Sequence, residues 1–480
     1  MNLAEALDIH AAARPDHAAI IAGETSIDYA GLARLVTSVT GRLIASGIRR
    51  GDVVGVCLKD SPDHLVANYA LARMGAVILP MDWRWTEPEK STVASHFGAR
   101  LVIALPEQGP IGDIALTTLD ALPGSVGEGA AERPVEGEDL PLLLSLSSGT
   151  TGRPKGPCVT HRQMLRRFWT HWINLGLNGT DRYVSATPLY FGGGRTFAMS
   201  ILFSGGTVVL FPPPFDADAL AAELERVSAT STFLVPTQLR KLLEAGDERK
   251  VAVRKLRLLI SSGAPLDPEE RNAIAATLNG NFVEYYASTE GGGISLATPE
   301  TRLRSPNSVG RPVFGVEVQC VSDTHELLPP GAVGQLRYRG PGVASGYFGE
   351  AGGGESPFRD GWFYPGDLAS LDEGGHVELR GRRKDVIIRG GVNIYPTEIE
   401  QVLRGHEYVA EAAVTGAPSP KLGETVAAFV VVRRPVDADT LRAWCSARLA
   451  PYKVPEQFVF LDELPRNSAG KIVKAALRVA

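Results

Sequence analysis

Residues 147–156, with the sequence SSGTTGRPKG, directly follow the apolar run Leu142–Leu146. An apolar run of this length predicts a buried strand, and we expect a helix after the loop. Glycines let the backbone approach a ligand, hydroxyls and amides can donate to phosphate oxygens, and Lys155 adds a positive charge. The GxxxxGK(S/T) spacing of a Walker A loop is absent, because the fifth position after Gly152 is Pro157. A flexible surface loop is the alternative, but ten such residues at a strand end favour a phosphate-binding loop.

Short apolar runs alternate with helical patterns through most of the chain, which predicts parallel sheets covered by helices. The expected strands are Val53–Leu58, Leu101–Leu105, Leu142–Leu146, Thr207–Phe211, Thr232–Val235, Leu256–Ile260 and Phe282–Tyr286. The expected helices are Leu65–Met74, Ala217–Val227 and Pro268–Leu278. Ligands of such sheets bind beyond the carboxyl ends of the strands. Two further glycine-rich segments, Ser261–Pro265 and Ala287–Gly293, directly follow predicted strands, so we expect a nucleotide site at this edge.

The composition is that of a soluble globular protein with two or three domains. The chain has 480 residues, of which 44% are hydrophobic and 21% charged, and a net charge of −5 that calls for no nucleic-acid partner. The four cysteines form no CxxC pair, which favours a reduced, cytoplasmic protein without a zinc or redox motif. The N-terminus lacks the pattern of a signal peptide. The longest apolar stretch, Phe197–Phe211, is interrupted by residues 204–206, so no membrane span is expected.

The character of the sequence changes after about Gly331. Two short strand patterns, Gly334–Arg339 and His376–Arg380, lead to the basic cluster Arg380–Lys384. The expected elements beyond it are a helix at Glu398–Arg404, strands at Val409–Thr415 and Val426–Val432, and a helix at Ala438–Leu449. We therefore predict a large N-terminal domain over residues 1–383 and a small C-terminal domain over residues 384–480.

The loop SSGTTGRPKG is similar to the phosphate loop of the adenylate-forming superfamily, which includes acyl-CoA synthetases, peptide-synthetase adenylation domains and beetle luciferases. Further motifs of that superfamily follow in order as far as Lys471. The resemblance implies an α/β fold: a large domain of helix-covered, mainly parallel sheets with a β-barrel-like part, and a small mobile α+β C-terminal domain. It implies that the loop binds the phosphates of ATP through Ser147, Ser148, Gly149, Thr150, Thr151, Gly152 and Lys155.

Two segments resemble the adenine and metal sites of that superfamily. Residues 261–265, SSGAP, resemble the turn that lies against adenine, which implies contacts from Gly263, Ala264 and Pro265. Residues 285–290, YYASTE, resemble its Tyr-Gly-x-Thr-Glu segment. Thr289 is expected to donate to a phosphate oxygen and Glu290 to hold Mg²⁺. Tyr285 or Tyr286 can stack on a purine, although Tyr285 has an equal claim to be a core aromatic because strand side chains alternate.

The last motifs resemble the ribose site, the hinge and the mobile lysine of the superfamily. In residues 361–367, GWFYPGD, Asp367 is expected to accept hydrogen bonds from the ribose hydroxyls, with Pro365 standing where relatives have threonine. The run 381–400 implies that Arg382 contacts the nucleotide, Lys384 is the hinge and Gly390 borders the pantetheine tunnel. In residues 465–472, PRNSAGKI, the resemblance implies that Lys471 bridges the acid's carboxylate and the α-phosphate.

The acyl pocket is expected around residues 188–195, PLYFGGGR. Phe191 stands where many CoA ligases have histidine, and Gly192 stands where amino-acid-activating relatives have aspartate, so an amino acid substrate is not expected. The glycine triplet predicts room for a bulky group, and the size of Ala287 suggests a medium pocket. Arg195 can meet a second carboxylate, but a structural role is favoured. The residues assigned to the pocket are Tyr190, Phe191, Gly192, Arg195, Ala287 and Gly292.

These motifs predict an ATP-dependent acid:CoA ligase that uses Mg²⁺. The acid and ATP give acyl-AMP and pyrophosphate, and coenzyme A then gives the thioester and AMP. The residues assigned to catalysis are Lys155, Thr289, Glu290 and Lys471. Two alternatives remain open: transfer of the acyl group to a carrier-protein thiol, and a catalytically silent protein that keeps the nucleotide fold. The sequence does not identify the acid, and it predicts no oligomeric state.

Overall fold

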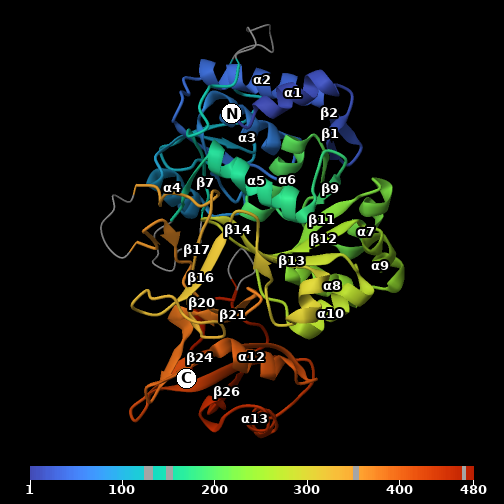
Figure 1. Ribbon diagram of the computed structural model, residues 1–480. Helices are drawn as coiled ribbons and strands as arrows, with labels where there is room; N and C mark the ends of the chain where they lie inside the picture. The colour runs from blue at the N-terminus through green and yellow to red at the C-terminus, as the bar shows by residue number, and fades with distance from the viewer. Residues whose placement is uncertain (124–132, 147–154, 350–355, 467–471, 480) are drawn as a thin grey trace. The chain divides into compact units, whose positions relative to one another are not determined.

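The computed structural model describes residues 1–123, 133–146, 155–349, 356–466 and 472–479 (Figure 1). The chain forms two compact units. The first comprises residues 1–306, 310–317 and 339–363, and the second comprises residues 307–309, 318–338 and 364–480. Within the described ranges, no helix combines the length and apolar character that a bilayer crossing needs. The four cysteines are free thiols.

The first unit contains a nine-stranded sheet in the order β15-β14-β13-β12-β11-β9-β10-β1-β2. Neighbouring strands from β13 to β1 are parallel, while β2, β14 and β15 add antiparallel edges. The strands are β1 Ala18–Ala22, β2 Thr25–Asp28, β9 Arg182–Ser185, β10 Thr207–Leu210, β11 Ser231–Leu234, β12 Leu258–Ser261, β13 Phe282–Ser288, β14 Gly292–Ala297 and β15 Arg311–Pro312.

A second sheet of the first unit has six strands in the order β6-β5-β3-β4-β7-β8. All neighbours are parallel except β7 and β8. The strands are β3 Val53–Cys57, β4 Val77–Pro80, β5 Ala99–Ala104, β6 Ala115–Thr117, β7 Pro141–Leu144 and β8 Cys158–Thr160. A short hairpin, β18 Phe358–Arg359 with β19 Trp362–Phe363, also belongs to this unit.

Helices pack on both faces of the nine-stranded sheet. The largest core joins α2, α3, α5 and α6 to strands of both sheets, and every residue of α3 from His64 to Met74 is buried. Helices α7 to α10 cover the other face over a second core (Figure 1). The helices are α1 Glu5–Ala13, α2 Tyr29–Ala45, α3 Pro62–Met74, α4 Glu87–His96, α5 His161–Leu175, α6 Gly192–Ser204, α7 Ala217–Arg226, α8 Pro236–Glu244, α9 Asp247–Arg254, α10 Pro268–Thr277 and α11 Pro299–Arg304.

The second unit is built mainly on antiparallel strands. Strand β20 pairs with β17 and β21, and a further sheet has the order β23-β22-β25-β24, with β26 parallel to β25. Helices α12 and α13 share a core with that sheet. The elements are β16 Glu317–Val321, β17 Gly334–Arg339, β20 Asp367–Leu371, β21 Val377–Arg382, β22 Ile387–Arg389, β23 Val392–Ile394, α12 Pro396–Arg404, β24 Val409–Ser419, β25 Gly423–Val432, α13 Ala438–Ser446 and β26 Gln457–Phe460.

The predicted α/β fold is confirmed, and each strand and helix expected from the sequence is present within a few residues of its predicted bounds. One local expectation is wrong. The loop after β7 does not lead directly into a helix, because strand β8 intervenes and pairs with β7 before α5 begins at His161. The division into units by contacts does not locate a hinge, so the boundary at Lys384 stays a prediction.

Candidate active site

Two predicted motifs of the first unit follow neighbouring strands of the nine-stranded sheet at their carboxyl ends. Strands β12 and β13 are parallel neighbours, so the segments that follow Ser261 and Ser288 leave the sheet on the same side. After Ser261, Gly263 adopts a positive φ of +100°, which an L side chain rarely tolerates. The turn residues Gly263, Ala264 and Pro265 are exposed and accessible to a ligand.

Glu290 lies just beyond β13 with its side chain almost buried. The Tyr347 hydroxyl donates to Glu290 Oε1 at 3.1 Å, and Lys155 Nζ lies 5.2 Å from the centre of the Tyr347 ring. The backbone beside Tyr347 is bridged to Pro157, and Phe348 N–H donates to the Gly156 carbonyl at 2.9 Å. Tyr347 therefore connects the end of the predicted phosphate loop to the predicted metal ligand.

Arg167 of α5 fixes the backbone that carries Thr289 and Glu290. Its guanidinium donates to the carbonyls of Thr289 at 3.2 Å and Glu290 at 2.7 Å, while its Nε donates to the Gly342 carbonyl at 2.9 Å. A Cβ at Gly292 would lie 2.9 Å from Arg167 Cγ. The structure therefore places Gly292 under the stem of Arg167, and its assignment to the acyl pocket stays a prediction. The sequence does not mark Arg167 or Tyr347 as site residues, since neither lies in a motif that predicts a site.

The two adjacent tyrosines of β13 have different surroundings. Tyr285 is 4% exposed, its hydroxyl is 2.6 Å from Thr170 Oγ1, and its ring packs edge-on against His171. It is therefore the core aromatic of the two alternatives, and its assignment to the purine is corrected. Tyr286 is half-buried, while Ala287 packs at the margin of the main core.

A charged network holds the loop that precedes α6. The Asp60 carboxylate accepts the Leu189 N–H at 2.7 Å, and Arg84, paired with Asp82 at 2.8 Å, donates to the Tyr190 hydroxyl. Burial raises the pKa of Asp60 to about 6, against the lowering effects of the Leu189 N–H and Arg84. The sequence does not mark Asp60 and Arg84 as site residues, because their partners are distant along the chain. The predicted pocket aromatic Tyr190 is therefore fixed by the second sheet and its connecting loops.

Arg195 is a structural cation. It is 1% exposed and donates to the carbonyls of Leu189 at 3.1 Å and Tyr190 at 3.0 Å. Burial, with a smaller contribution from the charge of Arg167, lowers the pKa of Arg195 to about 9. A side chain so enclosed and already engaged in supporting this loop is unsuited to a second substrate carboxylate, which agrees with the structural role that the sequence favours.

The glycine triplet of α6 leaves less room than the sequence predicts. A Cβ at Gly193 would lie 2.9 Å from the Phe233 ring, and one at Gly194 would lie 2.3 Å from the Thr187 carbonyl oxygen. At Gly192 the nearest atom is 3.9 Å away, on Ser145. Two of the glycines thus accommodate the chain itself, and Gly192 alone of the three could take a Cβ without a close contact.

In the second unit, the structure brings Asp367 and Arg382 together. They are register partners on β20 and β21, and Arg382 Nε lies 2.8 Å from Asp367 Oδ1. Arg382 also donates to the Pro365 carbonyl at 2.9 Å. Lys384 is exposed in a short 3-10 turn, and Gly390 adopts a φ of +57° at the turn between β22 and β23. A carboxylate and a guanidinium on adjacent strands suit hydroxyl and phosphate groups respectively.

Some of the predicted site residues lie outside the described ranges: Ser147, Ser148, Gly149, Thr150, Thr151, Gly152 and Lys471. The described residues contain no group of three or more metal-binding side chains. A single carboxylate such as Glu290 nevertheless fits Mg²⁺, which proteins usually hold through one or two carboxylates and the phosphates of the substrate.

Comparisons with known proteins find similar sequences along the whole chain. Residues 7–348 match the AMP-binding enzyme family, and residues 398–471 match the AMP-binding enzyme C-terminal domain. Over 100% of this chain and 98% of its own length, the indoleacetate–CoA ligase of Aromatoleum aromaticum is 32% identical. A feruloyl-CoA synthase of Amycolatopsis is 33% identical over 97% of this chain and 96% of its own. A fatty acid–[acyl-carrier-protein] ligase, ScoC of Streptomyces coeruleorubidus, is 30% identical over 99% of this chain and 96% of its own.

Solved structures show the same likeness. The o-succinylbenzoate CoA synthetase MenE of Bacillus subtilis, in complex with its acyl-adenylate intermediate, superposes with a TM-score of 0.90 and 29% identity. The match covers 99% of this chain and 98% of that chain. The same enzyme has been solved with ATP and a magnesium ion, with a TM-score of 0.90 and 28% identity over 98% of both chains.

Proposed function

We infer that this chain, which belongs to the AMP-binding enzyme family, is an ATP-dependent ligase that joins a carboxylic acid to coenzyme A. In the first half-reaction a carboxylate oxygen attacks the α-phosphorus of ATP and pyrophosphate leaves. In the second, the thiol sulfur of coenzyme A attacks the acyl carbon and AMP leaves. A carboxylate, with a pKa of about 4, is already ionised at neutral pH, so the first step needs no general base. The obstacle is the electrostatic repulsion between the carboxylate and the triphosphate of ATP.

The observation that carries this function is the cluster of Lys155, Tyr347 and Glu290 at the carboxyl edge of the sheet. Lys155 offers a positive charge to the phosphates, and Thr289 offers a hydroxyl donor. Glu290 would hold a magnesium ion, which when bound offsets the charge of the phosphates. Catalysis by these groups rests on positioning and electrostatic stabilisation, as in other phosphate chemistry.

We assign the remaining contacts from the predicted motifs. Asp367 would accept the ribose hydroxyls, Arg382 would contact the nucleotide and Lys471 would stabilise the charge that develops at the α-phosphate. The chain beyond Lys384 would reorient between the half-reactions, so that Lys471 is replaced by the segment around Gly390. The adjacency of Asp367 and Arg382 supports a common ligand for these two residues.

We propose a medium-size aryl acid as the substrate. Gly192, where an added Cβ would meet no close contact, directly follows Tyr190 and Phe191, whose aromatic rings suit a planar substrate. No carboxylate follows Phe191 to pair with an ammonium group, and Arg195 is committed to backbone carbonyls. Relatives that act on indoleacetate and ferulate are consistent with this acid class.

Pyrophosphate release across aryl, branched, medium-chain and dicarboxylic acids tests the proposal. We expect the highest kcat/KM with an arylacetic or arylacrylic acid, and thioester formation with coenzyme A. Faster transfer to a holo carrier protein would favour the carrier-loading alternative, which the similarity to ScoC motivates. No pyrophosphate release with any acid would favour the silent nucleotide-binding alternative.

A further inference from the structure

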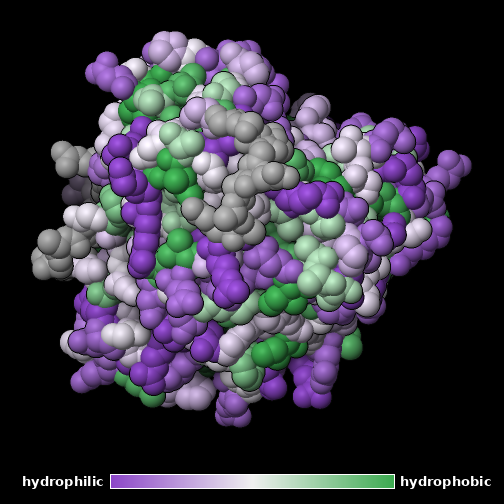
Figure 2. Space-filling view, turned by 90° about the horizontal axis from the view of Figure 1, so that it is seen from above, coloured by the Kyte–Doolittle hydropathy of each residue, from purple (hydrophilic) through white to green (hydrophobic). Residues whose placement is uncertain are grey.

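A cavity of about 370 Å³ in the first unit lies between the carboxyl ends of α2 and α3 and residues 133–135. Among the residues that the structure describes, its lining contains no acidic side chain and four arginines: Arg49, Arg50, Arg73 and Arg133. The apolar side chains Ile48 and Met74 also line it. Figure 2 shows hydrophilic and hydrophobic side chains interspersed on the face of the molecule that is seen from above.

The cavity is separate from the candidate active site. Arg50 and Met74 come just before β3 and β4, so the cavity lies at the amino ends of these parallel strands. The predicted phosphate loop leaves β7, their parallel neighbour, at its carboxyl end. The two sites thus lie at opposite ends of the parallel strands of one sheet. None of the cavity's arginines belongs to a motif of the active site.

Backbone hydrogen bonds fix the cavity wall. Val135 N–H donates to the Arg73 carbonyl at 2.9 Å, and Gly51 N–H donates to the Gly75 carbonyl at 2.9 Å. A Cβ at Gly75 would lie 3.3 Å from Arg50 Cγ, so the stem of Arg50 packs against this glycine. A ligand would therefore meet a wall that is already formed, which lowers the entropic cost of binding.

Three of the four guanidinium groups are available to a ligand. Arg73 is almost buried and paired with Asp8 at 2.9 Å. Arg49, Arg50 and Arg133 are exposed, and within the ranges that the structure describes no carboxylate pairs with their side chains. The nearby carboxylate of Asp52 accepts the backbone N–H of Arg49 and lies 3.6 Å from Arg100.

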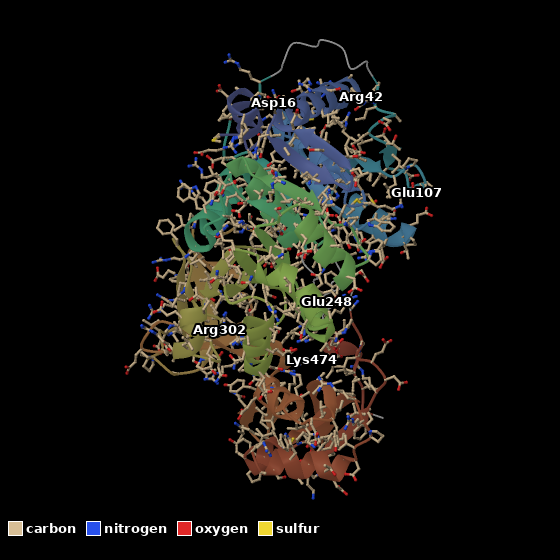
Figure 3. The ribbon with its side chains drawn as sticks, turned by 90° about the vertical axis from the view of Figure 1, so that its right-hand side faces the viewer. Asp16, Arg42, Glu107, Glu248, Arg302 and Lys474 are labelled. Atoms are coloured by element: carbon tan, nitrogen blue, oxygen red, sulfur yellow. The ribbon has the colours of Figure 1, made fainter. Side chains whose placement is uncertain are left out.

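Other basic side chains at this end of the unit are already engaged. Arg42, labelled in Figure 3, lies on α2 and donates to the carbonyls of Asp120 at 2.7 Å and Leu122 at 3.1 Å. Arg42 therefore links two segments of the chain, whereas Arg49, Arg50 and Arg133 line the cavity.

We propose that this arginine cavity binds a small organic phosphate, with the phosphate groups on Arg49, Arg50 and Arg133 and its apolar part on Ile48 and Met74. Guanidinium groups match phosphate oxygens in geometry and keep their charge at any physiological pH. The cavity volume is near the lower end of small-molecule sites, which run from about 300 to 1,000 Å³. The combined charge calls for a ligand with two or more negative charges, such as a diphosphate.

Arginine footprinting of the full chain with phenylglyoxal tests the site directly. Inorganic pyrophosphate and isopentenyl diphosphate serve as probes, each added with a non-hydrolysable ATP analogue and Mg²⁺ present to occupy the active site. We expect both probes to slow the modification of Arg50 and Arg133, and isopentenyl diphosphate to protect at lower concentration. Arg34, an exposed arginine of α2 outside the cavity, is the internal control and should react at an unchanged rate. Equal reactivity of all three arginines with and without the probes would overturn the proposal.

Charge-neutral variants give an independent measure. Isothermal titration of pyrophosphate into Arg50→Gln and Arg133→Gln, with the ATP site occupied, should show about tenfold weaker binding for each lost cation. Arg34→Gln should bind as the unmodified chain does, and the circular dichroism of all three variants should be unchanged. Binding of equal strength in all of them would contradict the site. Equal protection by inorganic pyrophosphate and isopentenyl diphosphate would contradict the role of Ile48 and Met74.

Discussion

At the scale of single residues, the site depends on Tyr347 and Arg167, which no motif of the sequence marks. Tyr347 contacts Glu290 and Lys155, and Arg167 holds the carbonyls of Thr289 and Glu290. These contacts orient groups that the sequence shows only as separate motifs. Loss of the Tyr347 hydroxyl should therefore affect chemistry more than the stability of the fold, whereas loss of the buried Arg167 should affect both.

Substitution Tyr347→Phe removes the hydroxyl that donates to Glu290 and leaves the ring beside Lys155. We expect the rate of pyrophosphate release to fall about tenfold, because a hydrogen bond to a charged group contributes about 1.5–3 kcal/mol. The concentration of Mg²⁺ needed for half-maximal rate should rise, which a purely structural loss would not cause. Tyr452→Phe, an exposed tyrosine of the second unit, is the control and should leave both quantities unchanged. Unaltered magnesium dependence in Tyr347→Phe would refute the link to Glu290.

Asp60 should make the stability of the first unit depend on pH. Burial raises its pKa from 3.8 to about 6, so in this range the folded chain binds more protons than the unfolded chain. The free energy of unfolding should therefore fall as the pH rises through this window, by up to about 3 kcal/mol. Asp60→Asn keeps an oxygen for the Leu189 N–H but does not titrate. Urea unfolding of both proteins between about pH 4 and pH 7 measures the difference, and parallel pH profiles would contradict the assignment.

At the scale of elements, the first turn of α6 contains one glycine that close packing requires and one that is assigned to the acyl pocket. Gly194 approaches the Thr187 carbonyl so closely that a Cβ would lie 2.3 Å from its oxygen, whereas the nearest atom to a Cβ at Gly192 is 3.9 Å away. Two glycines of one motif therefore have different physical reasons to be glycine.

The pair Gly194→Ala and Gly192→Ala tests this distinction. Gly194→Ala should lower the free energy of unfolding by about 1–3 kcal/mol, as overpacking does in other cores. Gly192→Ala should leave stability within about 0.5 kcal/mol but lower kcat/KM for the bulkiest accepted acids more than for the smallest. Thermal melting and the acid panel measure the two effects. An unchanged order of preference among acids in Gly192→Ala would remove this glycine from the pocket.

A buried ion pair joins α10 to β13. Arg271 and Glu284 are about 5% exposed and 2.6 Å apart, and Arg271 also donates to the Pro306 carbonyl at 2.8 Å. Burial raises the pKa of the Glu284 carboxyl, against the opposing charge of Arg271. The nearby Arg302 is labelled in Figure 3.

Removing one partner should cost more than removing both. Arg271→Met leaves the Glu284 charge buried without its guanidinium, and we expect a loss of about 3–5 kcal/mol. The double variant Arg271→Met with Glu284→Leu should recover most of it, since similarly sized apolar side chains replace buried pairs at little cost. Denaturant unfolding of the three proteins gives the comparison. Equal losses in the single and double variants would show that the Pro306 contact, rather than the ion pair, stabilises this region.

At the scale of the whole molecule, the chain has two compact units, and each carries some of the residues that the proposed reaction needs. Glu290 and Lys155 belong to the first unit, while Asp367, Arg382 and the predicted hinge Lys384 belong to the second. The proposed reaction therefore requires both units, and its two half-reactions can be separated by substitution.

Lys471→Ala should lose acyl-AMP formation but still convert preformed acyl-AMP and coenzyme A to the thioester. Lys384→Pro should do the reverse, because proline restricts the backbone rotation that a hinge requires. Pyrophosphate release measures the first half-reaction, and thioester formation from synthetic acyl-AMP measures the second. Equal loss of both halves in Lys471→Ala, or unchanged thioester formation in Lys384→Pro, would refute the two-state proposal.

The alternation of apolar runs and helical patterns was sufficient to predict the parallel sheets, because period and composition are local properties. The strand at Cys158–Thr160 escaped prediction, since three residues carry too little pattern and its existence depends on pairing with β7. The contacts of Asp60 with Leu189 and of Arg84 with Tyr190 could not be predicted from the sequence either, because each joins residues that are distant along the chain.

The sequence by itself determined the fold class, the order of the motifs and the chemistry of their side chains, since these follow from residue type and spacing. Only the tertiary structure decided that Tyr285 lies in the core, that Arg195 supports a loop and that most of the glycine triplet is filled by the chain itself. Which way a side chain points, and what already occupies the space beside it, depends on segments that meet only when the chain folds. The same reason explains the arginine cavity, whose side chains come from separate segments and form no motif in the sequence.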